Sequence, residues 1–167
     1  MIKIRKARLG DETEISQAIK EGVKRGTWKY TATIKYTNKK LEELRKSLSP
    51  GSNSKTFVAV DSKTGKIVGS LGYYFKKGSR LRHRIGLGWS VHPDFTGQGI
   101  GTKMLSHALE DAKKKGFKRA EAEVAIENAA SLKIAQKCGF EIEGTKKKGL
   151  LNDEGRCIDT YIMGKIL

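Results

Sequence analysis

The sequence predicts an α/β fold, a single domain in which helices flank one mixed sheet. Strand-like segments dominate the first half of the 167-residue chain, and residues 85–125 read as one strand–helix–strand unit. A doubly wound sheet would need strands and helices to alternate throughout, and residues 1–80 do not alternate in this way. The length fits one domain spanning residues 1–167. We expect about six or seven strands and about four helices.

The first half begins with a strand over residues 2–8, where apolar and polar residues alternate. A helix follows from Asp11, because acidic residues fill its first turn. Its expected buried stripe is Ile15, Ala18, Ile19 and Val23. Asn38 is a candidate cap for a second helix, which ends before Pro50. That helix carries Leu41, Leu44 and Leu48. Strands at 56–60 and 66–71 then flank a turn and form a hairpin.

The second half alternates more regularly. A strand over residues 84–92 precedes a helix over 99–115, and a strand follows at 119–125. The helix has apolar residues at 3.6-residue spacing: Ile100, Met104, Leu105, Ala108, Leu109 and Ala112. A further helix is expected at about 129–137, and two strands near 140–148 and 156–164 complete the sheet.

Charge is the most unusual bulk property, because 34 basic and 18 acidic residues give a net charge of +16. One interpretation is a polyanionic partner, such as nucleic acid or a phosphate-rich cofactor. The other, which we favour for most of the lysines, is a solvated surface, since they are scattered along the chain. No run of about 18 apolar residues predicts a membrane span. The N-terminus lacks the apolar stretch of a signal peptide, so a cytoplasmic protein is expected.

The cysteines and histidines do not predict a metal site. Cys138 and Cys157 lie far apart in the sequence, and His83, His92 and His107 lack ligand spacing. Cys138 falls in an apolar helical stripe, where a buried structural thiol is the simplest interpretation.

Residues 85–91 alternate between large apolar side chains and almost none. Ile85, Leu87, Trp89 and Val91 form one face, and Gly86, Gly88 and Ser90 form the other. Glycine weakens a strand, so two glycines on one face indicate that something approaches the backbone closely. A neighbouring helix and a ligand both remain candidates.

A glycine-rich turn follows directly, where residues 91–103 read VHPDFTGQGIGTK. Such a turn before a helix presents backbone N–H groups and the positive end of the helix dipole, which suit a phosphate or pyrophosphate. The order Gly101-Thr102-Lys103 does not have P-loop spacing. A Rossmann fingerprint would need glycine where Thr102 stands.

This segment resembles the GNAT superfamily of acyl-CoA-dependent N-acyltransferases, whose pyrophosphate motif is Gln/Arg-x-x-Gly-x-Gly/Ala after a strand ending in Val-x-Pro. A second family-like segment spans residues 128–140, which read NAASLKIAQKCGF. The pattern is closest to ribosomal-protein N-terminal acetyltransferases and small-molecule-modifying members. The resemblance implies a mostly antiparallel sheet splayed between its fourth and fifth strands. It departs from the family at Thr96, which stands where Arg or Gln is usual.

The resemblance also implies an acetyl-CoA site. The backbone of Trp89, Ser90 and Val91 would pair with the pantetheine arm, and Asn128 would hydrogen-bond it. Asn128 is also a candidate helix cap, and it could do both. The pyrophosphate would lie against Gly97, Gln98, Gly99, Ile100, Gly101 and Thr102.

Transfer of an acetyl group to an amine needs a base and donors for the developing oxyanion. The N–H of Val91 is the candidate oxyanion donor. Glu123 is the candidate base, although it could equally be a solvated glutamate that pairs with a lysine. Ala135 stands where many relatives place a tyrosine that acts as the general acid. Ser131 is therefore the candidate acid, and the alternative is that it is a residue of the helix surface. Other candidate donors are Tyr73, Tyr74, Tyr161 and His92.

The expected function is acetyl transfer from acetyl-CoA to a primary amine of a protein N-terminus, an amino acid or another small amine. Trp28 and Tyr30 would line the acceptor pocket or cap the core. A peptide or ribosomal protein is an expected partner, a membrane or nucleic acid is not, and a homodimer is compatible with the resemblance. The alternative is a catalytically degenerate acyl-CoA-binding module, or one associated with nucleic acid or the ribosome.

Overall fold

All seven predicted strands and all four predicted helices occur in the computed structural model, which describes residues 1–26, 30, 37–152 and 154–167. The strands are β1 (Ile2–Lys6), β2 (Ser54–Asp61), β3 (Ile67–Phe75), β4 (Arg84–Val91), β5 (Arg119–Ala125), β6 (Glu141–Leu151) and β7 (Cys157–Ile166). The helices are α1 (Asp11–Lys24), α2 (Asn38–Leu48), α3 (Ile100–Lys114) and α4 (Ala129–Lys137), with a short 3₁₀ helix η1 (Pro93–Phe95) before α3.

The strands form one mixed sheet in the order β1-β2-β3-β4-β5-β7-β6. Neighbours pair antiparallel except β4 and β5, which run parallel. That parallel ladder joins residues 84–86 to residues 119–121 and extends no further in the described chain, although β4 continues to Val91 and β5 to Ala125. The predicted splay between the fourth and fifth strands is therefore confirmed, and so is the fold class.

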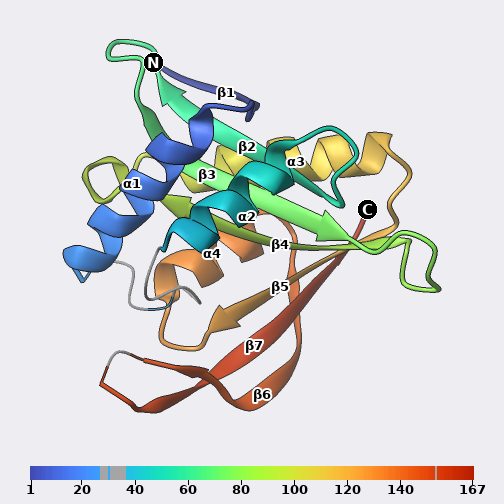
Figure 1. Ribbon diagram of the computed structural model, residues 1–167. Coiled ribbons are helices and arrows are strands. Elements are labelled where there is room, and N and C mark those ends of the chain that lie inside the picture. Colours follow the sequence, from blue (N-terminus) through green and yellow to red (C-terminus); the bar gives the residue numbers. More distant parts are fainter. Residues whose placement is uncertain (27–29, 31–36, 153) are drawn as a thin grey trace.

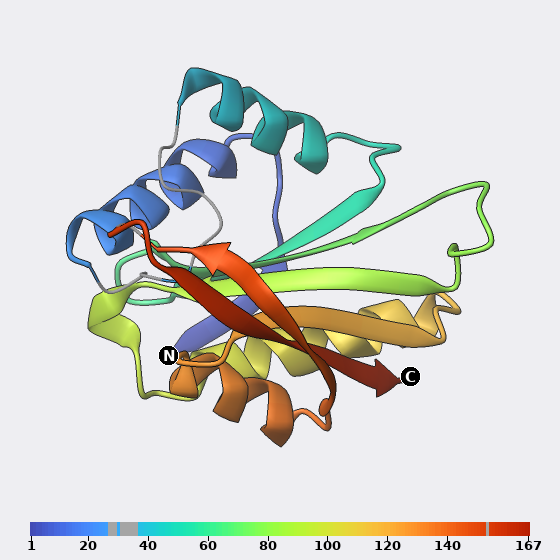
Figure 2. The same cartoon turned by 90° about the horizontal axis from the view of Figure 1, so that it is seen from below.

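Helices cover both faces of the sheet, with α1 and α2 on one side and α3 and α4 on the other (Figures 1 and 2). The larger core lies between the sheet and α3, and the predicted apolar stripe of α3 is buried there throughout. A smaller core joins Ile15 of α1 to Val58 and Ile67 of the sheet. The sheet thus has two buried faces at its centre, and the β6–β7 hairpin extends beyond the helices (Figure 1).

Two details of the first half differ from the sequence prediction. Thr37, not Asn38, caps α2, because its side chain accepts a hydrogen bond from the N–H of Lys40. The acidic first turn of α1 is buried: Asp11 binds Arg5, with 2.6 Å between oxygen and nitrogen, and Glu12 binds Arg45 at 2.9 Å. Ion pairs with β1 and α2 therefore fix the start of α1, which its acidic composition alone did not indicate.

Candidate functional site

Strand β4 presents the two faces that the sequence predicts, but its glycines have different neighbours. Ile85 and Leu87 lie in the main core, and Trp89 packs against it. On the other face, a Cβ at Gly86 would collide with the ring of Tyr74 from β3. Around Gly88 no described atom lies within 4 Å of such a Cβ. At Gly86 the close neighbour is a side chain of the adjacent strand, and not the helix or ligand that the sequence suggested. The space over Gly88 is open.

The backbone of β4 faces two directions in turn. The N–H of His92 donates to Val68 of β3 over 2.8 Å, and the carbonyl of His83 accepts from Lys118, just before β5, over 2.8 Å. Because successive peptide groups of a strand point to opposite sides, even-numbered residues such as Ser90 bond toward β3. The backbone groups of Trp89 and Val91 are directed toward β5, at the level where β4 and β5 have separated.

The glycine-rich turn leads from β4 into α3 through two left-handed residues. Gly97 has φ 75° and Gly99 has φ 73°, values that glycine adopts without strain. The first N–H to bond within α3 is that of Lys103, which donates to Gly99 over 3.0 Å. The N–H groups of residues 100–102 precede it and lie at the positive end of the helix. Gln98 is exposed on the turn.

Gly101 serves the packing of α3 against α4. A Cβ at this position would lie 2.6 Å from Cδ1 of Ile134. Its missing side chain therefore allows the two helices to approach each other. Thr102 contributes to the same contact, since the thiol of Cys138 donates to its carbonyl with a sulfur–oxygen distance of 3.7 Å.

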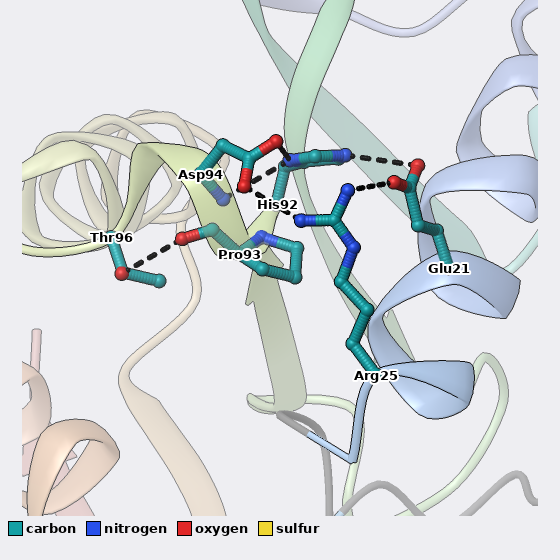
Figure 3. Close-up of polar contacts among 6 residues, drawn as sticks. All are labelled: Glu21, Arg25, His92, Pro93, Asp94 and Thr96. Carbon is teal, nitrogen blue, oxygen red and sulfur yellow. Dashed lines mark hydrogen bonds and ion pairs between the residues drawn. The ribbon is translucent and has the colours of Figure 1, made fainter.

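The residues between β4 and the glycine turn are tied to the end of α1 (Figure 3). The N–H of Asp94 donates to Nδ1 of His92 over 3.3 Å, so the ring proton is on Nε2, which donates to Glu21 over 3.2 Å. Arg25 bonds both Glu21 and Asp94. The hydrogen bond from His92 holds the pKa of Glu21 below its ordinary value. His92 therefore positions this segment, and Thr96 binds locally through a hydrogen bond to the carbonyl of Pro93.

Glu123 lies on the face of β5 opposite α3 and already has two partners. Thr160 of β7 donates to its Oε1 over 2.7 Å, and Nζ of Lys146 in β6 lies 2.6 Å from its Oε2. Burial by itself would raise the pKa of Glu123, but the hydrogen bonds from Lys146 and Thr160 outweigh it and hold the pKa below its ordinary value. The predicted alternative, a glutamate paired with a lysine, is confirmed as an ion pair.

Asn128 caps α4, as the sequence suggested. Its Oδ1 accepts from the N–H of Ser131 over 3.1 Å, and its amide NH₂ group can donate to a ligand. Ser131 stands in the first turn of α4 and is half-buried. Helix α4 covers the face of the sheet opposite the one on which Glu123 projects (Figure 2). The two candidate catalytic residues therefore belong to opposite faces.

The other candidate donors have distinct surroundings. Tyr73 is buried and donates to Asp111 over 2.6 Å, and burial together with this bond raises the pKa of its hydroxyl above the ordinary value. Tyr161 packs against the main core. Tyr74 is 63% exposed and projects on the same face as Glu123. Ala135 is buried and offers no donor.

A cavity of about 290 Å³ opens on this face where β4 and β5 begin to separate. A second cavity of about 190 Å³ adjoins it near Arg84. The larger one is lined by Tyr74, Gly86, Leu87, Glu121, Ala122, Glu123, Lys146 and Ile162. Glu121 is held by Arg84 and Arg119, over 2.9 and 2.8 Å. Glu123 and Lys146 are the remaining charged groups of this lining.

Sequence reasoning missed Lys146, Thr160 and Arg156 as site residues. Lys146 belongs to a run of three lysines that reads as solvated surface, and only the pairing of β6 with β7 brings it to Glu123. Arg156 binds Glu127 with two bonds of 2.8 and 2.9 Å. The hydroxyl of Tyr30 also donates to Glu127, over 3.4 Å. For Thr160, the alternation of apolar and polar residues along β7 was the available signal. Trp28, the other residue predicted for the acceptor pocket, lies outside the described residues.

Cys138 and Cys157 are both free, with Cys138 half-buried between α3 and α4 and Cys157 exposed. The described helices are too short or too polar to cross a membrane. In the described part of the chain, no three His, Cys, Asp or Glu side chains gather in a metal-binding group.

Comparison with known proteins gives the site its context. Residues 23–140 match the model of the acetyltransferase (GNAT) family. The chain is 30% identical over 103 residues to an L-amino acid N-acetyltransferase, AaaT, of Escherichia coli, a match covering 61% of this chain and 63% of that protein. Three curated relatives are each matched over 63% of their own length or less.

Solved structures match over nearly the whole chain. A ribosomal-protein-alanine N-acetyltransferase of Brucella melitensis has a TM-score of 0.83 at 26% identity, with 99% of both chains covered. A phosphinothricin acetyltransferase of Sinorhizobium meliloti, in complex with AcCoA, has a TM-score of 0.86 at 24% identity. That match covers 99% of this chain and 88% of the other, and at this identity it supports the fold alone.

Proposed function

Because this chain belongs to the GNAT family of acetyltransferases, we propose that it transfers an acetyl group from acetyl-CoA to a primary amine by direct attack on the thioester. The acceptor would be a protein N-terminus, an amino acid or another small amine, and residues 1–167 would act as one N-acetyltransferase domain in the cytoplasm. The observation that carries the proposal is the opening between β4 and β5, toward which the backbone groups of Trp89 and Val91 are directed.

Several features of this chain fit acetyl-CoA. The indole Nε1 of Trp89 is buried without a hydrogen-bond partner among the described residues, and buried donors normally have one. Open space over Gly88 and the left-handed glycines before α3 leave room for a ligand near the backbone. The N–H groups at the start of α3 would receive the pyrophosphate. The amide of Asn128 would hydrogen-bond the pantetheine arm.

The chemistry divides between backbone and side chains. Bound acetyl-CoA would supply an acetyl group activated as a thioester. The N–H of Val91 would stabilise negative charge on the carbonyl oxygen. Glu123 would take the proton of the acceptor's ammonium, directly or through water, so that the amine's lone pair can attack. The carbon–nitrogen bond forms and the carbon–sulfur bond breaks. The second proton lost from the nitrogen would pass to the departing sulfur through the hydroxyl of Ser131 or Tyr74, or through water, so that CoA leaves as a thiol.

Two measurements test the proposal. Calorimetric titration with acetyl-CoA should give saturable binding, and release of free CoA thiol should then depend on an added amine from a panel of peptides, amino acids and polyamines. Absence of binding at millimolar acetyl-CoA would end the proposal. Binding without amine-dependent thiol release would instead identify an acyl-CoA-binding module that has lost catalysis. A salt-dependent gel shift in place of both would favour a nucleic-acid or ribosome-associated module.

A further inference from the structure

The cavity between β4, β5 and the β6–β7 hairpin is small and carries charges of both signs. Its volume of about 290 Å³ is at the lower end of the range for ligand pockets, roughly 300–1,000 Å³. Ile162 and the ring of Tyr74 provide apolar surface, while Glu123 and Lys146 provide a carboxylate and an ammonium. A small ligand with an apolar part and both charges would match this lining.

The two charges differ in how firmly they are held. Thr160 holds one oxygen of Glu123 over 2.7 Å, and Thr160 is itself buried. Lys146 has no such anchor in the described contacts beyond its bond to Glu123, and its side chain is 51% exposed. Ion pairs of this exposure contribute little to stability. A ligand could therefore draw the lysine away without disturbing the fold.

The other cations of this face are held by stronger or more numerous ion pairs. Arg84 and Arg119 share Glu121 at the edge of the cavity. Arg156 grips Glu127 with two bonds at the end of β5, outside the cavity lining. The bidentate pair of Arg156 with Glu127 is stronger than a single lysine contact. Lys146 is thus the lining cation that can change partners most easily.

Resting on the proposed function, we propose that Lys146 binds the carboxylate of the acceptor, so that the preferred acceptor is a small free α-amino acid. The amino acid enters between the two charges, with its carboxylate on Lys146 and its ammonium on Glu123. A peptide N-terminus has an amide at the position of this carboxylate and leaves Lys146 on Glu123.

This exchange links recognition to proton transfer. While Lys146 stays on Glu123, the carboxylate is a weak proton acceptor, since its pKa is held low. Once the acceptor's carboxylate takes the lysine, the acceptor's own ammonium replaces the lysine as the hydrogen-bond donor to Glu123, so the proton to be removed lies directly on the carboxylate that accepts it. The ammonium proton then passes to Glu123, and the free amine attacks the thioester.

The test compares acceptors that differ only at the carboxylate. Glycine, L-alanine and L-leucine are assayed against their carboxamides and against the amines that lack the carboxylate, by thiol release at saturating acetyl-CoA. We expect kcat/KM for the amino acid to exceed that of its carboxamide by about 10- to 100-fold, because a hydrogen bond to a charged group is lost. The Lys146→Gln variant should lose most of this preference through KM.

Matched variants make the outcome decisive. Lys147→Gln removes the neighbouring lysine, which pairs with Asp159 instead, and should keep the preference. Loss of the preference in Arg156→Gln but not in Lys146→Gln would overturn the assignment. Carboxamides that react as well as amino acids in the wild type would also overturn it, yet would leave the proposed function standing. Only a lack of thiol release with every amine would remove both.

Discussion

The two sides of the β4–β5 opening are built from different chemical groups. On the side of β4 and α3, the candidate groups are backbone N–H donors and glycines that are neighbours in the sequence. On the side of β5, β6 and β7, they are side chains from distant segments, joined in ion pairs such as Glu123–Lys146 and Glu127–Arg156. The first side suits a constant ligand held by main-chain geometry. The second can vary by single substitutions, and we infer that it determines the acceptor.

Of the substitutions that distinguish the two sides, the largest loss of activity is expected at Glu123. Glu123→Gln keeps the shape but cannot accept a proton, so kcat should fall at least about tenfold, since a general base contributes roughly 10²–10⁴-fold. Affinity for acetyl-CoA, measured by calorimetry, should stay unchanged because β4 and α3 are untouched. Unaltered turnover would remove Glu123 from the mechanism.

A matched pair of glycines tests the other side. Gly99→Ala places a side chain on a left-handed residue at the start of α3, and Gly116→Ala does the same at its far end, where φ is 85°. Each should lose about 1–2 kcal/mol of stability from backbone strain. Gly99→Ala alone should also weaken acetyl-CoA binding, by about tenfold if one charge-assisted contact is lost. Equal affinities in the two variants would show that the glycine turn does not contact the cofactor.

Gly101 should behave as a packing residue. Gly101→Val would push on Ile134 and cost about 1–3 kcal/mol in unfolding free energy from overpacking. Combining it with Ile134→Ala should recover part of that loss, because the two side chains would share the same space. Urea denaturation of the two single variants and the double variant gives the coupling. Strict additivity would argue against the contact between α3 and α4 as the reason for this glycine.

The smallest expected effect is a change in protonation. In Lys146→Gln, the pKa of Glu123 should rise, because the cation and hydrogen bond that favour the carboxylate are gone while its burial remains. Its protonation then occurs at higher pH than in the wild type. NMR titration of the Glu123 carboxyl carbon measures this directly. In Lys147→Gln the titration of Glu123 should not move, whereas the pKa of Asp159, held low by Lys148 and Lys147, should rise.

The sequence by itself predicted the order of elements and the candidate groups for a cofactor, and its resemblance to the GNAT family implied the splayed sheet. Strand and helix periods follow from which residues are buried, and the apolar stripe of α3 and the side-chain-free face of β4 both appear in the structure. A glycine turn is local, so its spacing can be read along the chain. The structure gives Gly101 a packing role that the sequence did not predict, since its neighbour Ile134 is 33 positions away in another helix.

Tertiary structure alone brought together the side chains that we propose for the acceptor side. Glu123 could be selected from the sequence, but its partners come from β6 and β7, and strand register brings them to the same face. Lys146 and Lys147 are adjacent and chemically identical, yet one binds Glu123 and the other Asp159. The physical reason is that an ion pair depends on distances of a few ångströms between segments far apart in the chain, which composition and spacing do not contain.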